Sequence, residues 1–467
     1  MEANSADLLM VTALDQVAWL FNVRGGDVSH SPVALAFALV EKEKATLYVD
    51  PSKVTPEVGA HLAEAGVGTA PYLFDRLSKD LHAVVKTGGR VWLDKEAVSV
   101  AVENAATSAV EAAAASDAAK ARAKVRRKGG KGAHAADEAR SDARQKKLVE
   151  GTSPLAMDKA VKNQAELAGM REAHLRDSVA LASFFSWLEK EVPLRSVSEA
   201  QAGDVLLGMR GDLEGFIEPS FPTIAGANAN AAIIHYRAAH DTCKEISTDT
   251  LLLLDSGGQF DCGTTDVTRT VHLGEPSPRQ KDCFTRVLKG HIALDQMVFP
   301  QGTPGFVLDG FARQSLWQAG LDYRHGTGHG VGAALNVHEG PQGISPRFGN
   351  TTPIRAGMVV SNEPGYYEDG AFGIRIENLL AVHEADTENR FGGMDFLRFE
   401  RLTFVPIQAK MIAMELLTES ELKWLDDYHA QVWELVSPRM EEGAPRTWLE
   451  QNTRPLAEHA KMLETAK

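Results

Sequence analysis

The sequence predicts an α/β (α+β) protein with a smaller N-terminal α/β domain over residues 1–155 and a larger C-terminal domain over residues 156–467. Three observations favour this organisation. The 467 residues are enough for two or three domains with large cores. Strand and helix patterns alternate from residue 8 to about 103, as is typical of α/β domains. The composition then changes abruptly between about 104 and 147.

The elements of each domain follow from local patterns. Short apolar runs predict strands over 8–12, 46–49 and 89–93, and the spacing of apolar residues over 14–21 is helical. In the second domain a long helix is expected from 158 to about 190, where Val192 and Pro193 stop it. A helix-rich portion follows from 417 to about 467.

The alanine-rich stretch over about 104–147 has almost no large apolar side chains, so we expect a disordered insertion with helix possible on its first flank. It carries a basic run that is interrupted by two glycines. Such a run also fits a nuclear-localisation or nucleic-acid-binding segment. The net charge of −14 argues against nucleic-acid binding as the main function of the chain.

Cysteine usage and hydropathy bear on the compartment. The three cysteines, Cys243, Cys262 and Cys283, are odd in number and widely spaced, which favours a reducing, cytoplasmic compartment over a disulfide framework. No run approaches the roughly 18 apolar residues of a membrane span. The N-terminus has acids where a secretory signal would have lysine or arginine. We therefore expect no membrane partner.

Five residues of the second domain predict a metal site: Asp255, Asp266, His329, Glu363 and Glu377. Apolar runs that are typical of strands precede or flank three of them, so the carboxylates should project from strand ends into one cleft. Each motif alone is commonly a turn or a flexible loop, and the joint occurrence carries the prediction. Four carboxylates would repel one another unless two divalent cations neutralised them. Oxygen-rich ligation with one imidazole favours Mn²⁺, with Co²⁺ or Zn²⁺ as alternatives.

The same motifs carry a family resemblance. The chain from about residue 155 resembles the pita-bread metallopeptidases and is most similar to their cytosolic-type Xaa-Pro aminopeptidase (aminopeptidase P) group. The segments that match are 160–171, 221–224, 233–236, 255–270, 325–341, 363–378, 402–408 and 424–428. Residues 18–25 are similar to the middle domain of that family. The larger members have a further N-terminal domain, so the chain is either a two-domain variant or a shortened one.

The resemblance implies a pita-bread catalytic domain with two metal ions. Asp255 would bind one ion, Asp266 and Glu377 would bridge both, and His329 and Glu363 would complete the second. A hydroxide held between the ions would attack the peptide carbonyl, and Glu363 would take the proton from that water. Arg375, two residues before Glu377 and so expected on the same strand face, would orient a ligating carboxylate.

Further side chains in the matching segments are expected around the substrate. By resemblance, His338 stabilises the developing oxyanion, His235 lines the pocket and His325 buttresses the site. Arg24 would reach the far end of the cleft and Tyr367 would contact the transition state. His329 and Glu363 would face the substrate as well as the metals.

The resemblance thus implies a homodimeric enzyme that removes the first residue from peptides with an N-terminal Xaa-Pro sequence. Two alternatives stay open. A prolidase would accept only dipeptides, because it also binds the free C-terminal carboxylate. A metal-free binding module of the same fold would have no need for the five ligand residues.

Overall fold

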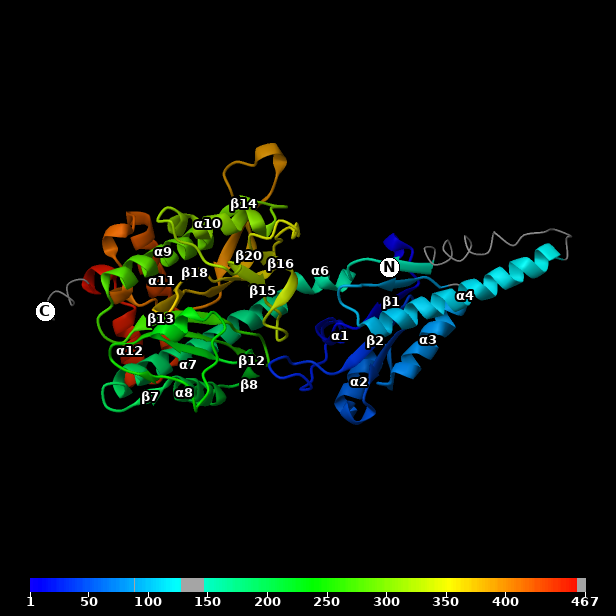
Figure 1. Ribbon diagram of the computed structural model, residues 1–467, viewed down its shortest axis with the longest axis horizontal. Coiled ribbons are helices and arrows are strands. Elements are labelled where there is room, and N and C mark those ends of the chain that lie inside the picture. Colours follow the sequence, from blue (N-terminus) through cyan, green and yellow to red (C-terminus); the bar gives the residue numbers. More distant parts are fainter. Residues whose placement is uncertain (88, 127–146, 460–467) are drawn as a thin grey trace. The chain divides into compact units, whose positions relative to one another are not determined.

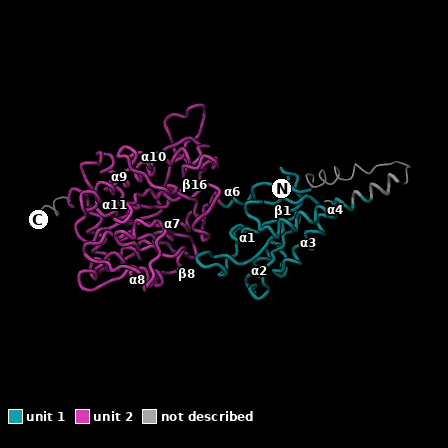
Figure 2. The backbone as a smooth tube through the Cα atoms, in the orientation of Figure 1, with its two compact units in different colours: residues 1–159 teal, residues 160–467 magenta. Residues whose placement is uncertain are grey.

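The computed structural model describes residues 1–87, 89–126 and 147–459 (Figure 1). The chain forms two compact units, residues 1–159 and 160–467, so the division falls at 159 where the sequence predicted 155 (Figure 2). Both units mix helices and strands, and the predicted fold class is confirmed. Within the described residues, no helix has both the length and the apolar character needed to cross a membrane.

The first unit is built on a six-stranded sheet in the order β4-β3-β2-β1-β5-β6. Its strands are β1 (Leu8–Val11), β2 (Ala36–Glu41), β3 (Ala45–Val49), β4 (Val67–Pro71), β5 (Val91–Leu93) and β6 (Leu148–Glu150). Its helices are α1 (Leu14–Phe21), α2 (Pro56–Glu64), α3 (Phe74–Lys86) and α4 (Val100–Arg126). The β1–β2 and β2–β3 pairs are antiparallel, and the other three are parallel. The strands predicted over 8–12, 46–49 and 89–93 correspond to β1, β3 and β5, and the helix predicted over 14–21 is α1.

Helix α4 corrects the expectation of a disordered insertion from about residue 104. Side chains of its first half, including Val102, Ala106 and Val110, are buried in one core with Leu77 and Leu81 of α3. Alanine favours helix strongly, and its small side chain allows a neighbouring helix to approach closely. The prediction is therefore wrong for the part of the stretch that packs in this core. The basic run beyond residue 126 lies outside the described residues.

The second unit contains two main sheets. One has three antiparallel strands in the order β13-β11-β9, and the other has six strands in the order β14-β21-β20-β17-β15-β16. The strands of the first are β9 (Ile224–Ala227), β11 (Leu251–Ser256) and β13 (Val267–His272). Those of the second are β14 (Val298–Pro300), β15 (Gly328–Gly330), β16 (Glu339–Ile344), β17 (Val359–Asn362), β20 (Asn378–Ala385) and β21 (Phe396–Arg401).

Shorter pairs and several helices complete this unit. The short strands are β7 (Val197–Ser198), β8 (Phe216–Pro219), β10 (Glu245–Ile246), β12 (Gly258–Phe260), β18 (Gly365–Glu368) and β19 (Phe372–Arg375). The helices are α7 (Gln164–Glu191), α8 (Glu199–Gly211), α9 (Pro278–Asp295), α10 (Gly305–Trp317), α11 (Glu419–Val436) and α12 (Ala444–Asn452). One large core joins residues of α7, α9 and α11 to β11 and β13, which fixes the strand ends that carry the candidate site.

The long helix predicted from 158 is two helices, α6 (Pro154–Ala160) and α7. Asn163 separates them because its side chain caps α7. Asn163 Oδ1 accepts from the Glu166 N–H at 2.9 Å, and Glu166 Oε2 accepts from the Asn163 N–H at 2.9 Å. This reciprocal capping box starts a new helix. Helix α7 then ends at Glu191, as the following Val-Pro sequence predicted.

Candidate metal centre

The five predicted metal ligands lie at or beside strand ends of the two main sheets. Asp255 is in β11, opposite Thr268 of β13, and Asp266 immediately precedes β13, so the antiparallel pairing brings both aspartates to one end. From the other sheet, His329 lies within β15, Glu363 follows β17 and Glu377 precedes β20. Segments far apart in the sequence therefore converge at strand ends, where the apolar runs predicted the carboxylates to lie.

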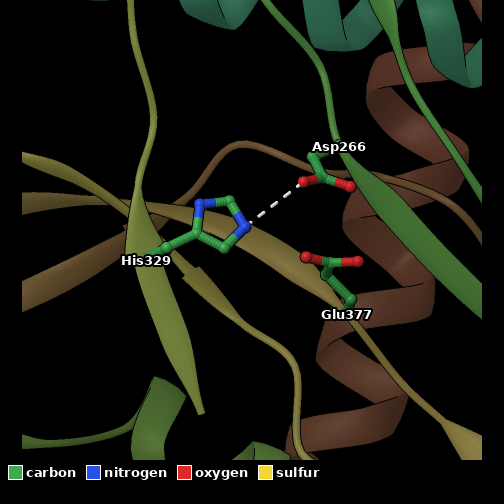
Figure 3. Close-up of side chains that lie close together, drawn as sticks. All are labelled: Asp266, His329 and Glu377. Atoms are coloured by element: carbon green, nitrogen blue, oxygen red, sulfur yellow. Dashed lines mark ion pairs between the residues drawn. The ribbon is translucent and has the colours of Figure 1, made fainter. Parts of the chain in front are cut away.

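Three of these side chains can hold one ion between them. Ligand atoms of Asp266, His329 and Glu377 all lie within 4.8 Å of one another (Figure 3). His329 Nε2 is 3.5 Å from Asp266 Oδ2 and 3.6 Å from Glu363 Oε1. These separations exceed those of ordinary hydrogen bonds. The imidazole and the carboxylates therefore face one another without being hydrogen-bonded together.

The electrostatics of the cluster favour bound cations. Burial raises the pKa of Asp266 well above its usual range, and the charges of Asp255 and Glu363 raise it further. Burial and the charge of Asp266 do the same to the pKa of Glu377. Burial also raises the pKa of Glu363, although His329 and Arg375 oppose the shift. Divalent cations would stabilise the ionised carboxylates, and this donor set of oxygens with one imidazole fits them.

These residues face a cavity of about 210 Å³. It is lined by Phe221, Ile224, Ile234, His235, Asp255, Asp266, His325, Gly326, Gly328, His329, His338, Glu363, Arg375 and Glu377. The lining contains the predicted site residues except Arg24 and Tyr367. The apolar members Phe221, Ile224 and Ile234 were not predicted as site residues, although each falls within a segment that carries the family resemblance.

Arg375 links the two halves of the cluster. Its Nη2 donates to Asp255 Oδ2 at 2.6 Å and its Nε donates to Thr268 Oγ1 at 3.1 Å. Thr268 Oγ1 in turn donates to Glu377 Oε2 at 2.8 Å. The expected shared strand face of Arg375 and Glu377 is wrong, because β19 ends at Arg375. The arginine instead contacts Asp255 directly and reaches Glu377 through Thr268, a residue that the sequence motifs did not single out.

Two predicted histidines are neutral at physiological pH. Burial lowers the pKa of His338 to about 4, helped by the charge of His329. The His338 ring lies edge-on to the His329 ring, with centroids 4.4 Å apart. Burial and the charge of Arg375 lower the pKa of His325 to about 3. Both rings therefore keep one N–H donor and one acceptor nitrogen.

The predicted residues Tyr367 and Arg24 lie outside the cavity lining, and so does Cys262. Tyr367 is behind His325: its hydroxyl lies 2.9 Å from His325 Nε2 and accepts from Arg375 Nη1 at 2.6 Å. Arg24 belongs to the first unit, where its guanidinium donates to main-chain carbonyls nearby, and its contact with substrate stays a prediction. Cys262 is half-buried, and burial raises the pKa of its thiol to about 11, as suits a packed thiol.

Comparisons with known proteins relate this fold and cluster to a metallopeptidase family. Residues 168–384 match the model of metallopeptidase family M24, residues 1–127 that of the creatinase/prolidase N-terminal domain, and residues 395–456 that of the C-terminal region of peptidase M24. The chain is 52% identical to aminopeptidase P2 of Arabidopsis thaliana over 96% of its own length and 62% of the relative. It is 40% identical to aminopeptidase P1 of Lotus japonicus, over 96% and 71%.

A solved structure gives the same result. The X-prolyl aminopeptidase of Caenorhabditis elegans, described as a cytosolic enzyme with a di-nuclear active site, superposes with a TM-score of 0.83 at 33% identity, over 97% of this chain and 69% of the other. The chain belongs to metallopeptidase family M24, in its aminopeptidase P group. It spans 62% of the length of the Arabidopsis relative.

Proposed function

We propose that the chain is a metal-dependent aminopeptidase that releases the N-terminal residue from peptides with proline in the second position. The convergence of Asp255, Asp266, His329, Glu363 and Glu377 on one cavity, in a chain of the aminopeptidase P group, carries this proposal. The di-nuclear site described for the Caenorhabditis relative supports two divalent ions here.

The five side chains would share the two ions. We assign Asp255 to one ion, Asp266 and Glu377 to both, and His329 and Glu363 to the other. Mn²⁺ is the proposed metal because oxygen donors predominate, with Co²⁺ and Zn²⁺ as alternatives. Bound divalent ions of this kind lower the pKa of water and polarise a substrate carbonyl.

The remaining chemistry belongs to side chains of the protein. Glu363 lies at the edge of the cluster, where its carboxylate can accept the proton of the attacking water. His338 is neutral and lines the cavity, so its N–H can donate to the carbonyl oxygen as negative charge develops there. Arg375 holds Asp255 in place through a 2.6 Å hydrogen bond. His235 and His325 also line the cavity. Contact of Arg24 and Tyr367 with the substrate is part of the proposal, and Tyr367 adjoins the cavity through its hydrogen bond with His325.

Proline poses a particular recognition problem. Its nitrogen carries no N–H and its φ is fixed near −65°, so main-chain pairing at that atom is impossible. The apolar wall formed by Phe221, Ile224 and Ile234 offers a surface for the ring. The free terminal amine would pair with the acidic side chains. A trans Xaa-Pro bond is expected to be required, because a cis bond would present the carbonyl wrongly.

We also propose a cytoplasmic homodimer. Helix α10 exposes Val307, Phe311 and Trp317 on its surface, each more than two-fifths accessible. Apolar and aromatic surfaces of this kind are typical of protein contacts. The free cysteines and the cytosolic relative support the compartment. Sedimentation velocity would give a dimer for the wild type and a monomer for a Phe311→Asp variant.

Peptide cleavage tests the proposal. Metal-depleted protein should be inactive, and Mn²⁺ should restore release of the first residue from an Xaa-Pro-Xaa tripeptide. Cleavage of Xaa-Pro dipeptides alone would assign the chain to the prolidases. No cleavage of either peptide, with any of the three metals, would leave the non-catalytic alternative.

A further inference from the structure

The segment that leads into β15 has no regular structure. Residues 321–327 lie in neither helix nor strand, yet they carry His325 and bring His329 to the cavity. Main-chain carbonyls of such a segment find no partners in a sheet ladder, and buried ones require hydrogen bonds from elsewhere. The source of those bonds therefore decides where His325 lies.

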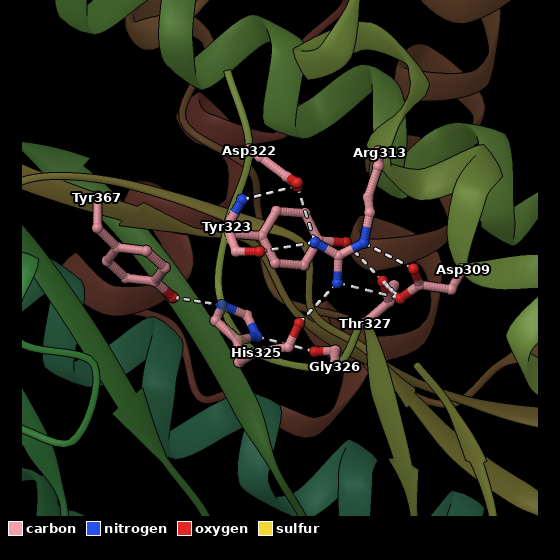
Figure 4. Close-up of polar contacts among 8 residues, drawn as sticks. All are labelled: Asp309, Arg313, Asp322, Tyr323, His325, Gly326, Thr327 and Tyr367. Atoms are coloured by element: carbon pink, nitrogen blue, oxygen red, sulfur yellow. Dashed lines mark hydrogen bonds and ion pairs between the residues drawn. The ribbon is translucent and has the colours of Figure 1, made fainter. Parts of the chain in front are cut away.

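Arg313 of α10 supplies them (Figure 4). Its Nη2 donates to the His325 carbonyl at 2.6 Å and its Nη1 to the Tyr323 carbonyl at 2.7 Å. Nη1 also donates to Asp322 Oδ1 at 2.8 Å. The guanidinium lies over the Tyr323 ring, 3.8 Å from its centroid. One side chain thus holds three residues of the segment at once.

Asp309, one helical turn earlier, completes the arrangement. It accepts from Arg313 Nε at 2.6 Å and from Nη2 at 3.2 Å, and both side chains are only 3% exposed. All five N–H groups of the guanidinium are therefore used. Thr327 Oγ1 donates to Asp309 Oδ1 at 2.7 Å, and the Thr327 carbonyl accepts from the Glu363 N–H at 2.8 Å. The cluster is thereby tied to a proposed metal ligand.

The orientation of the His325 ring follows from these contacts. Its Nδ1 lies 2.8 Å from the Gly326 carbonyl, which can only accept, so Nδ1 carries the proton. Nε2 is then an acceptor and takes the hydrogen bond from the Tyr367 hydroxyl at 2.9 Å. Tyr367 in turn accepts from Arg375, which contacts Asp255. A shift of the segment would misplace both His325 and Tyr367.

We propose that Arg313 is a positioning residue for the candidate active site: by clamping residues 322–327 it fixes the place and the tautomer of His325 and, through it, Tyr367. The claim rests on the proposed aminopeptidase function for its kinetic consequence only. Lysine cannot replace the arginine, because an ammonium has three donors on one atom and cannot span the carbonyls of Tyr323 and His325.

Arg313→Lys tests the proposal with a matched control on α9. Arg286 forms the same i, i+4 pair with Asp282 and donates to the Ser315 carbonyl at 3.3 Å, away from residues 322–327. Arg313→Lys is expected to lower kcat on an Xaa-Pro-Xaa peptide by about 10- to 100-fold, as for a small misplacement of reacting groups. KM and metal content should stay near wild type, and Arg286→Lys should match wild type.

Guanidinium ion at millimolar concentration should partly restore the kcat of Arg313→Ala and should not change the kcat of Arg286→Ala.

Wild-type kcat in Arg313→Lys, or a loss that excess Mn²⁺ fully restores, would overturn the proposal. A second readout needs no activity. In protein labelled with ¹⁵N-histidine, His325 should give the signals of a single Nδ1–H tautomer, assigned with His325→Gln. Those signals should change in Arg313→Lys and not in Arg286→Lys. An inactive wild type would refute the proposed function, whereas unchanged His325 signals in Arg313→Lys would refute the role of Arg313.

Discussion

Two buried clusters of charge in the second unit differ in how they are balanced. Around Arg313, the guanidinium uses all five donors, and Asp309 accepts from both Arg313 and Thr327. In the candidate metal centre, burial and mutual repulsion raise the pKa values of Asp266 and Glu377. Asp255 Oδ1 is buried there and accepts no hydrogen bond from the described residues.

This difference indicates that the Arg313 cluster has a structural role and that the carboxylate cluster is a binding site. A buried ion pair is tolerated when each partner has its hydrogen bonds, as at Arg313. Buried carboxylates that lack such partners cost free energy in the protein alone, and the cost is removed when they bind protons or when a ligand supplies the missing positive charge. The imbalance, more than the burial, therefore marks the metal centre.

The largest effect is expected from Asp266→Asn. The amide removes a charge that both ions would share, so metal content should fall and turnover should be lost. The metal-free variant should nevertheless melt at a higher temperature than the metal-free wild type, because repulsion with Asp255 and Glu363 is relieved. Metal analysis, peptide cleavage and calorimetry check the three parts. Full activity in the chelated wild type would contradict the metal assignment.

His338→Ala should lower kcat by about 10²- to 10³-fold, the effect of removing one oxyanion donor. Its metal content should stay normal, because His338 is not among the proposed ligands. His329→Ala is the matched control and should lose both metal and rate. Equal metal loss in the two variants would refute this division of roles.

The stability of the metal-free protein should depend on pH. The folded-state pKa values of Asp266, Glu363 and Glu377 are raised above the ordinary 3.8 and 4.5. The folded protein therefore binds protons more tightly than the unfolded chain, and stability falls as pH rises from about those ordinary values. Each unit of upward shift corresponds to about 1.4 kcal/mol. Chemical denaturation between pH 4 and 8 checks this, and Mn²⁺-loaded protein should show a weaker dependence.

The smallest effect concerns the first unit, where alanine and valine side chains of α4 pack against α3. Val110→Ala should lower the free energy of unfolding by about 2 kcal/mol, because two buried methyl groups are removed. Val100→Ala on the same helix is the control, since Val100 is 71% exposed, and its change should stay within about 0.5 kcal/mol. Equal effects of the two substitutions would contradict the packing of this helix.

These contrasts also show what a sequence can reveal. The proposed metal ligands are recognisable because three of the carboxylates follow or adjoin apolar strand patterns and all five residues occur together in the second domain. Arg313 is not, because an Asp–Arg pair one turn apart on a helix usually lies in solvent, and only the packing of α10 buries it. The buried alanines of α4, such as Ala105 and Ala106, give little hydropathy signal because their side chains are small, although they lie in one core with Leu77 and Leu81 of α3.

Metal stoichiometry tests the central claim most directly. Native mass spectrometry of the metal-depleted wild type, titrated with Mn²⁺, should show two ions per chain together with a rise in Tm. Asp266→Asn should bind fewer. A wild type that binds none of Mn²⁺, Co²⁺ or Zn²⁺, and is stable with its carboxylates unneutralised, would contradict the account.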